Sequence, residues 1–516
     1  MNLAAIDIGT NSIHLVIAEV TARQNIKVLI DEKEMVKLGV GVFATNQLSQ
    51  DAFDRGLEVI KRYVQLADQF GVEEIITAAT SATREAKNGG EFLDRLSKET
   101  GIVPRVISGK EEARLIFLAV RRAIAFGEEK VLVLDIGGGS TEATVGNQED
   151  IFFKKSIKLG VLRLLDMAGG KDTLDAQGLI DLEKHIQLAA EDIMKEVVQE
   201  GFTRVIGTSG TIRTLGEAAH LASKGSSIST VNAEVVSTKE LEKLSKKLLK
   251  MGPDKREKVP GISSNRVDAI HLGSLLLVRL LQMAKAESIT LCDASLREGL
   301  ILDYLDSNVS KKKHLLYPEG DLRHRSVSHL ALRYKSDVEQ KKHVAHLALQ
   351  LFDQLQEQHG LDETQREILE FACMIFEVGH FIGYPKYHKH SQYIIAHSRL
   401  RGFTNEEIML LGLLARYHRK KGPKKKQKQF KRLSKIQKRM IRFLAGIMRI
   451  AIGLDKTKNQ WVEKLVCELQ EERLRILLQG EENPDLEIWE SMRHRNVLEK
   501  ALRRKIEITA DNPVPL

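Results

Sequence analysis

The chain has 516 residues, of which 42% are hydrophobic and 29% charged, and its net charge at pH 7 is +9. This length is too great for one hydrophobic core and predicts about three or four domains, at roughly 100–200 residues each. Three widely spaced cysteines argue against a disulfide framework, and no apolar run approaches the roughly 18–20 residues needed to span a bilayer. We therefore expect a cytoplasmic protein without a signal peptide and without membrane contact.

The first 300 residues alternate strand-like and helix-like segments. Short apolar runs predict strands, and apolar residues at three- and four-residue spacing predict helices. In chain order the expected strands are 3–8, 13–20, 26–29, 74–79, 103–107, 131–136, 141–145 and 204–206, and the expected helices are 50–70, 91–98, 114–125 and 174–200. This alternation predicts an α/β architecture.

Two segments that lie 128 positions apart have nearly the same sequence, Ile6–Ser12 (IDIGTNS) and Leu134–Thr141 (LDIGGGST). In each, an aspartate ends an apolar run and small residues form a turn before the next extended run. Glycine permits a positive φ and lets backbone N–H groups approach an anion closely. The pair predicts a duplicated fold with a phosphate held between its halves.

Several carboxylates near these turns are candidates for chemistry. At a strand end beside a phosphate, Asp7 and Asp135 would hold a hydrated divalent cation, although a lone aspartate before glycine is often a turn residue. Ser108 and Glu111 have the spacing of a helix capping box, which leaves Glu112 without a capping role. Glu112 is either a base that activates water or an ordinary helix glutamate. Other candidates are Glu142, the segment Thr80–Arg84, a third small-residue turn at Gly207–Thr211, and Arg163, Arg266 and Arg297.

Beyond a polar linker near 305–315 the sequence pattern changes to one of mainly helices. The expected helices are 338–356, 364–376, 405–417, 434–453 and 485–494, and the expected strands are 464–468, 473–478 and 505–509. Residues 301–516 carry a net charge of +12, and 401–450 contains 16 basic and 2 acidic residues. The centre of this excess, Arg419–Arg432, is either a polyanion-binding surface or a solvated loop.

At four places the motifs match one family in order: Asp7–Ser12, Ile107–Leu115, Asp135–Glu142 and Gly207–Thr211. The chain resembles the exopolyphosphatase / guanosine pentaphosphate phosphatase family, which has the actin-like ATPase superfold. The resemblance implies that Glu112 is the catalytic carboxylate and that Asp135 and Glu142 help to hold magnesium and the water. Asp7, from its place at a strand end, is the third predicted magnesium ligand. The resemblance also implies a set of phosphate-binding residues: Asn11, Ser12, Arg84, Gly137, Gly138, Gly139, Ser140, Gly207, Ser209, Gly210 and Arg266.

The resemblance further implies an α/β fold whose first half is a duplicated actin-like (ribonuclease H-like) pair. The expected domains are actin-like domain I (1–124), actin-like domain II (125–305), a helical HD-like domain (306–455) and a small α+β domain (456–516). In the HD-like domain the would-be metal ligands read His343, Phe376-Glu377 and Ile452. Because apolar side chains cannot ligate a cation, we expect no second hydrolase there.

We expect an exopolyphosphatase that removes terminal phosphate processively from inorganic polyphosphate, with magnesium as cofactor and potassium as an optional stimulant. The family also predicts a homodimer. Rival functions are hydrolysis of guanosine pentaphosphate and low-turnover polyphosphate binding or sensing, whereas an actin-like kinase is disfavoured by Glu112. A long polyanion would also contact a basic surface formed by Lys420, Lys421, Lys424, Lys425 and Lys426.

Overall fold

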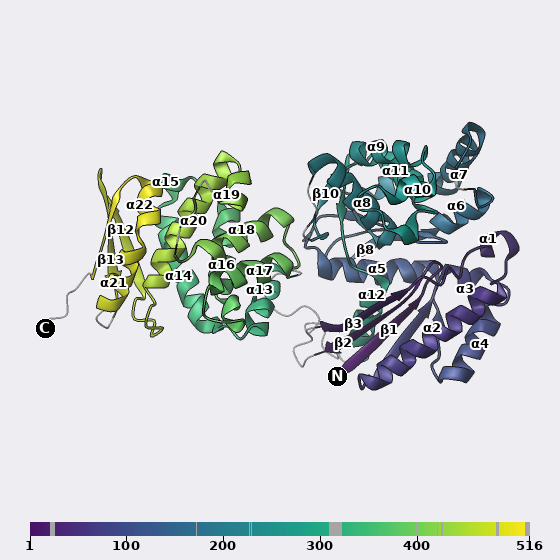
Figure 1. Ribbon diagram of the computed structural model, residues 1–516, viewed down its shortest axis with the longest axis horizontal. Coiled ribbons are helices and arrows are strands. Elements are labelled where there is room, and N and C mark those ends of the chain that lie inside the picture. The colour runs from purple at the N-terminus through teal and green to yellow at the C-terminus, as the bar shows by residue number, and fades with distance from the viewer. Residues whose placement is uncertain are drawn as a thin grey trace. The chain divides into compact units, whose positions relative to one another are not determined.

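The computed structural model describes residues 1–20, 26–171, 173–225, 228, 230–308, 322–398, 400–420, 422–424, 427–480 and 484–510. Its contacts divide the chain into two compact units, Met1–Glu319 and Gly320–Leu516 (Figure 1). Each unit is described by itself. No helix in the described ranges is both long enough and apolar enough to cross a membrane.

The first unit contains two sheets of related topology. The first has the strand order β3-β2-β1-β4-β5 and the second β10-β11-β9-β6-β7-β8. In each, a hairpin (β1–β2 or β6–β7) is antiparallel and its first strand pairs in parallel with a later strand (β4 or β9). The strands are β1 (Asn2–Ile8), β2 (Ile13–Val20), β3 (Ile26–Glu34), β4 (Glu74–Ala79), β5 (Arg105–Val106), β6 (Val131–Ile136), β7 (Thr141–Gly146), β8 (Ile151–Ile157), β9 (Arg204–Thr208), β10 (Val235–Ser237) and β11 (Ser288–Leu291). The expected α/β fold with a repeated half is confirmed.

Helices separate and cover the two sheets (Figure 1). Their bounds are α1 (Val42–Thr45), α2 (Gln50–Gln69), α3 (Ser81–Glu85), α4 (Gly89–Thr100), α5 (Gly109–Ala123), α6 (Val161–Met167), α7 (Ala176–Glu200), α8 (Ser209–Lys224), α9 (Thr238–Leu248), α10 (Pro253–Glu257), η1 (Ser264–Arg266), α11 (Ile270–Met283) and α12 (Leu296–Asn308). Helices α5 and α12 form the layer between the sheets, because their apolar residues share one core with Leu3 and Ala5 of β1 and with Val131 and Val133 of β6. Helices α2 and α4 cover the other face of the first sheet.

This layering explains why two distant aspartates converge. Side chains alternate between the faces of a strand, so Asp7 lies on the same face as Leu3 and Ala5. By the same alternation Asp135 lies on the face of Val131 and Val133. Both faces are turned toward the shared layer of α5 and α12, and both aspartates therefore point into the interior of the unit.

The second unit is built mainly of helices around one core. These are α13 (Leu322–Arg333), α14 (Val338–Gln354), α15 (Gln356–His359), α16 (Glu363–Ile375), η3 (Val378–Phe381), α17 (Tyr387–His397), α18 (Asn405–Tyr417), α19 (Lys428–Arg432), α20 (Lys435–Gly453), α21 (Asp485–His494) and α22 (Asn496–Leu502). A sheet of order β12-β13-β14 adjoins them, formed by Lys464–Leu469, Arg473–Gln479 and Lys505–Ala510. Leu474 and Ile476 of this sheet belong to the same core as the helices. The finer assignment of HD-like and small α+β domains stays a prediction.

Some elements differ from the sequence expectations for identifiable reasons. The strand expected at 103–107 is only Arg105–Val106, because Pro104 cannot donate a sheet hydrogen bond and Val103 is exposed. Helix α11 is buried nearly all round, which removes the amphipathic period that would have revealed it. The third small-residue turn is absent, since β9 runs through Gly207 to Thr208 and α8 begins at Ser209.

Candidate active site

The two repeated turns have the same backbone geometry and face one another. The Gly9 N–H donates to the Ser12 carbonyl (3.2 Å), and the Gly137 N–H donates to the Ser140 carbonyl (2.9 Å). A Cβ added to Gly138 would lie 2.9 Å from Thr10 Cβ, and one added to Gly139 would lie 2.5 Å from Ser81 Oγ. The second turn therefore needs glycine because the first half of the unit packs directly against it.

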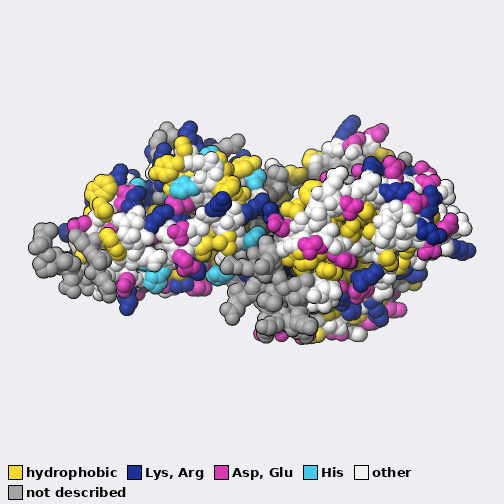
Figure 2. Space-filling model, turned by 90° about the horizontal axis from the view of Figure 1, so that it is seen from below, with side chains coloured by type: hydrophobic (Ala, Val, Ile, Leu, Met, Phe, Trp, Pro, Cys, Tyr) yellow, Lys and Arg dark blue, Asp and Glu magenta, His cyan; other side chains and the backbone are white. Residues whose placement is uncertain are grey.

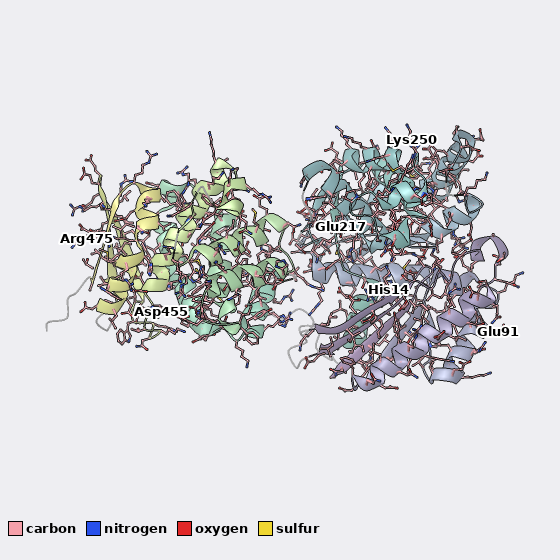
Figure 3. All side chains as sticks on the ribbon, in the orientation of Figure 1. His14, Glu91, Glu217, Lys250, Asp455 and Arg475 are labelled. Atoms are coloured by element: carbon pink, nitrogen blue, oxygen red, sulfur yellow. The ribbon has the colours of Figure 1, made fainter. Side chains whose placement is uncertain are left out.

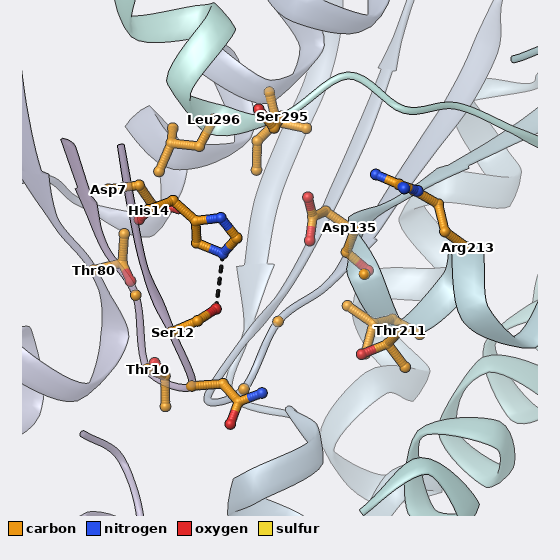
Figure 4. Close-up of a pocket in the computed structure, with 18 of the residues that line it drawn as sticks. Asp7, Thr10, Ser12, His14, Thr80, Asp135, Thr211, Arg213, Ser295 and Leu296 are labelled. Atoms are coloured by element: carbon orange, nitrogen blue, oxygen red, sulfur yellow. Dashed lines mark hydrogen bonds between the residues drawn. The ribbon is translucent and has the colours of Figure 1, made fainter. Parts of the chain in front are cut away.

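A cavity of about 430 Å³ lies between these turns (Figure 4). Figure 4 shows Asp7, Ser12 and His14 on one side and Asp135, Thr211 and Arg213 on the other. Most of the predicted site residues line this cavity: Asp7, Asn11, Ser12, Glu112, Asp135, Gly137, Gly138, Gly139, Ser140, Ser209, Gly210 and Arg266. Sequence positions up to 259 apart are thus brought to one place.

Among the described residues, three predicted members lie outside this lining. Arg84 Nη1 is 3.4 Å from Glu112 Oε2 and also donates to the Ile107 carbonyl (2.7 Å), so it contacts the site through Glu112. Glu142 is the cross-strand partner of Asp135 and accepts a hydrogen bond from Ser156 Oγ (2.7 Å). Gly207 has a packing role instead, since a Cβ at this position would lie 2.4 Å from the Ile289 side chain.

Three carboxylates that line the cavity (Asp7, Glu112 and Asp135) form an acidic wall, and their pKa values are perturbed, as is that of Glu142 outside the lining. Burial, and then the charge of Glu142, raises the pKa of Glu112 well above its usual value. Burial, followed by the charges of Glu112 and Asp7, raises the pKa of Asp135 to about 8. Burial and the Asp135 charge raise the pKa of Glu142 to about 8, and burial raises that of Asp7 to about 6. The wall therefore concentrates more negative charge than the protein itself neutralises.

This wall suits a magnesium ion that is shared with a phosphate. Over the described ranges, no three or more His, Cys, Asp or Glu side chains are grouped so as to hold a metal by themselves. Magnesium usually takes only one or two carboxylates together with water and substrate phosphate oxygens. Asp7 Oδ1 is buried and has no hydrogen-bond partner in the described structure. An unpaired oxygen of this kind beside mutually repelling carboxylates fits such an ion.

Glu112 is positioned by the start of α5. Ser108 caps this helix, and its Oγ accepts from the Glu111 N–H (3.2 Å) as expected. The Glu111 carboxylate pairs with Arg114 (2.7 Å) and no capping box forms. Glu112 lies one residue further round the helix and is 9% exposed at the cavity.

A basic wall of the cavity adjoins these carboxylates; Arg266 and Arg297 in it were candidates from the sequence, whereas Lys33, Arg213 and the neighbouring His14 were missed. Lys33, Arg213, Arg266 and Arg297 line the cavity together with His14. Burial and then these four cations, Arg297 foremost, lower the pKa of His14 to about 2. Burial and the three arginines lower the pKa of Lys33 to about 8. His14 could have been found from the alternation of side chains in the expected β1–β2 hairpin, because the register of this hairpin pairs His14 with Asp7. Arg213 could have been found from its helical spacing from Gly210.

The start of α8 brings small residues to this basic wall. Ser209 has a φ of +84°, which is uncommon for a residue with a Cβ, at the junction where β9 becomes α8. A Cβ on Gly210 would lie 2.0 Å from Arg266 Nη2. Glycine at 210 therefore lets the Arg266 guanidinium reach the cavity beside the helix start.

Arg163 has a supporting contact pattern. Its Nε donates to the Gly139 carbonyl (2.8 Å), and its Nη2 donates to Glu85 Oε1 (2.8 Å). Its guanidinium carbon lies 3.9 Å from the centroid of the Phe43 ring. Arg163 thus ties the second glycine turn to the first half of the unit.

Comparison with known proteins agrees with this geometry. A family model described as the Ppx/GppA phosphatase family matches residues 16–308, and a model of Ppx/GppA phosphatase domain III matches residues 322–496. The chain belongs to the Ppx/GppA phosphatase family. The expected resemblance is confirmed, and membership supports phosphatase activity.

Solved structures of the Ppx/GppA family resemble this chain. An exopolyphosphatase from Cytophaga hutchinsonii is 29% identical with a TM-score of 0.56, and the match covers 60% of this chain and 98% of that one. A Ppx/GppA family member from Aquifex aeolicus is 28% identical with a TM-score of 0.51, over 60% of this chain and 99% of that one. An exopolyphosphatase-like protein is 25% identical with a TM-score of 0.54, again over 60% and 99%.

The second unit of this Ppx/GppA protein has packed apolar side chains at two of its would-be ligand positions. At the would-be ligand positions, Phe376 is buried at 1% exposure and Ile452 packs against the core. Lys341 Nζ pairs with Glu377, and Gln340 Nε2 donates to Asp455 Oδ2 (2.7 Å); Figure 3 labels Asp455 in this unit and His14 in the other. The buried Lys341 ammonium is thus paired with Glu377, the one carboxylate among the would-be ligands.

Only part of the predicted basic surface can be placed. Lys420 and Lys424 are exposed, whereas Lys421, Lys425 and Lys426 lie outside the described residues. On the face seen in Figure 2, basic and acidic side chains are interspersed on both units. Binding of a polyanion by the block stays a prediction.

Proposed function

We propose that this protein is an exopolyphosphatase, which hydrolyses the terminal phosphoanhydride bond of inorganic polyphosphate and releases orthophosphate. The observation that carries the proposal is one cavity lined both by an acidic wall (Asp7, Glu112, Asp135) and by a basic wall (Lys33, Arg213, Arg266, Arg297). The first suits a metal and an attacking water, and the second suits the charge of a phosphate chain. A relative with a solved structure is itself an exopolyphosphatase.

Glu112 is the residue that we propose takes the proton from the attacking water. A carboxylate with a raised pKa is a stronger base than an ordinary one, and a base acts best when its pKa lies near the working pH. Arg84 holds the Glu112 carboxylate from one side at 3.4 Å. Arg84 also donates to the Ile107 carbonyl, which fixes the orientation of its guanidinium. Glu112 itself lines the cavity.

Asp7, Asp135 and Glu142 would hold magnesium. When bound, the ion supplies positive charge that neutralises phosphoryl oxygens and their developing charge. The backbone N–H groups of the two glycine turns add further donors around the terminal phosphate. The basic wall binds the following phosphates and orients the chain for in-line attack.

The test is phosphate release from long-chain polyphosphate and from guanosine pentaphosphate, measured side by side with magnesium. Higher kcat/KM on polyphosphate supports the proposal, and higher kcat/KM on the nucleotide assigns the protein to that substrate instead. Tight polyphosphate binding with negligible release from either would make it a binding or sensing protein. Glu112→Gln serves as the inactive control in each assay.

A further inference from the structure

The two halves of the first unit differ at one informative position. In the first hairpin the register pairs Asp7 with His14, and in the second it pairs Asp135 with Glu142. His14 and Glu142 each follow a turn serine by two residues. The repeat therefore places a histidine in one half where the other half has a carboxylate.

Each of these residues hydrogen-bonds to its own turn serine. Ser12 Oγ lies 2.7 Å from His14 Nε2, and a dashed line marks this hydrogen bond in Figure 4. Ser140 also hydrogen-bonds to Glu142, which accepts a second bond from Ser156. An ionised carboxylate can only accept, so the Ser140 hydroxyl hydrogen is directed into Glu142 and away from a ligand.

A neutral histidine can instead donate to its serine, which leaves the serine hydroxyl hydrogen free for a ligand. His14 Nδ1 is buried and has no hydrogen-bond partner within the described residues. The positive charges of Arg297, Lys33, Arg266 and Arg213 all act on the ring. Asp7 faces it across the strand pair, but Asp7 Oδ1 is likewise without a partner. A bare lone pair at Nδ1 is favoured beside four cations, and this places the ring proton on Nε2.

We propose that His14 is a positioning residue whose Nε2–H donates to Ser12 Oγ and so turns the Ser12 hydroxyl hydrogen toward a bound phosphoryl oxygen. Phosphoryl oxygens of an ionised substrate accept hydrogen bonds, and a hydroxyl whose oxygen is already satisfied is left with one donor to offer. Ser12 is 8% exposed, and both residues line the cavity. The inference rests on the proposed function for the identity of the anion and adds a role for a residue outside the acidic wall.

Kinetics on polyphosphate and equilibrium binding of inorganic phosphate test this in the full-length protein. A hydrogen bond to a charged group supports roughly a tenfold or larger change in affinity. We expect His14→Leu to raise KM and the phosphate Kd about tenfold with a smaller change in kcat. His14→Gln keeps an N–H donor near Nε2 and should recover most of the loss. In a Ser12→Ala background, His14→Leu should have little further effect.

The imidazole 15N chemical shifts of histidine-labelled protein report the tautomer without turnover. We expect the Nε2–H form for His14, assigned by its loss in His14→Gln. The inference would be overturned by an Nδ1–H form of His14 or by an unchanged phosphate Kd in His14→Leu. It would also be overturned if the fold-changes in Kd of His14→Leu and Ser12→Ala simply multiplied in the double variant. Failure to hydrolyse polyphosphate would contradict the proposed function alone, because the phosphate Kd and the tautomer are measured without hydrolysis.

Discussion

Removing the charge of Glu142 should stabilise the metal-free protein at alkaline pH. Glu142 is 2% exposed, and burial together with the Asp135 charge raises its pKa from 4.5 to about 8. The folded protein therefore holds this proton more tightly than the unfolded chain does. Stability from this group is fully present below about pH 4.5 and is lost as the pH rises through about 8.

The size of the effect follows from the shift. At 1.36 kcal/mol per pKa unit, a group titrating alone would remove about 5 kcal/mol from the free energy of unfolding. Because Glu142 titrates together with neighbouring carboxylates, not all of this shift belongs to Glu142 alone, and we expect about 2–3 kcal/mol. Glu142→Gln keeps an oxygen that can accept from Ser156, so it should gain most of this amount at pH 8.5 and little at pH 4.5.

Scanning calorimetry in EDTA at the two pH values measures this. We expect the first unit of Glu142→Gln to melt on the order of 5 °C above wild type at pH 8.5, at about 2–4 °C per kcal/mol. Glu149→Gln, at an exposed glutamate, is the matched control and should melt like wild type. Magnesium should raise the wild-type melting temperature more than that of Glu142→Gln. A variant less stable than wild type at pH 8.5 would refute the reasoning.

Three further predictions concern turnover, the second unit and the basic block. Glu112→Gln should lower kcat on polyphosphate by about 10²–10⁴-fold with its fold intact, whereas Glu111→Gln should stay near wild type; near-normal turnover in Glu112→Gln would assign the role to another carboxylate. Lys341→Met leaves the partly buried Glu377 without its partner and should lower the stability of the second unit by about 1–2 kcal/mol in denaturant titration, and adding Glu377→Gln should recover much of it; an unchanged midpoint would contradict this. Glutamine should replace the lysines of the basic block, which are Lys420, Lys421, Lys424, Lys425 and Lys426. Long-chain polyphosphate should then bind more weakly and its KM should depend less on salt, whereas short chains should change little. Equal losses on all substrates would indicate that the block supports folding.

Local features of the sequence were enough to find the elements and the turns. Helix α18 has the expected bounds of Asn405–Tyr417, and strand β4 has those of Glu74–Ala79, because each is marked by a period of apolar residues and by polar ends. The Gly9 and Gly137 turns were evident because a buried strand followed by glycine is a pattern within a few residues. Such signals depend on neighbours along the chain, and the sequence carries them directly.

The acidic and basic walls were decided by tertiary structure. Glu112 and Glu142 raise each other's energy only because α5 and β7 pack together, and no local pattern reports that distance. His14 reads as an ordinary strand residue until the sheet register sets it opposite Asp7 and the second half brings Arg213 and Arg266 beside it. Gly207 reads as a turn glycine, yet it lies in β9 where Ile289 leaves no room for a Cβ. Burial and charge are properties of packed neighbours, and only the fold determines which neighbours those are.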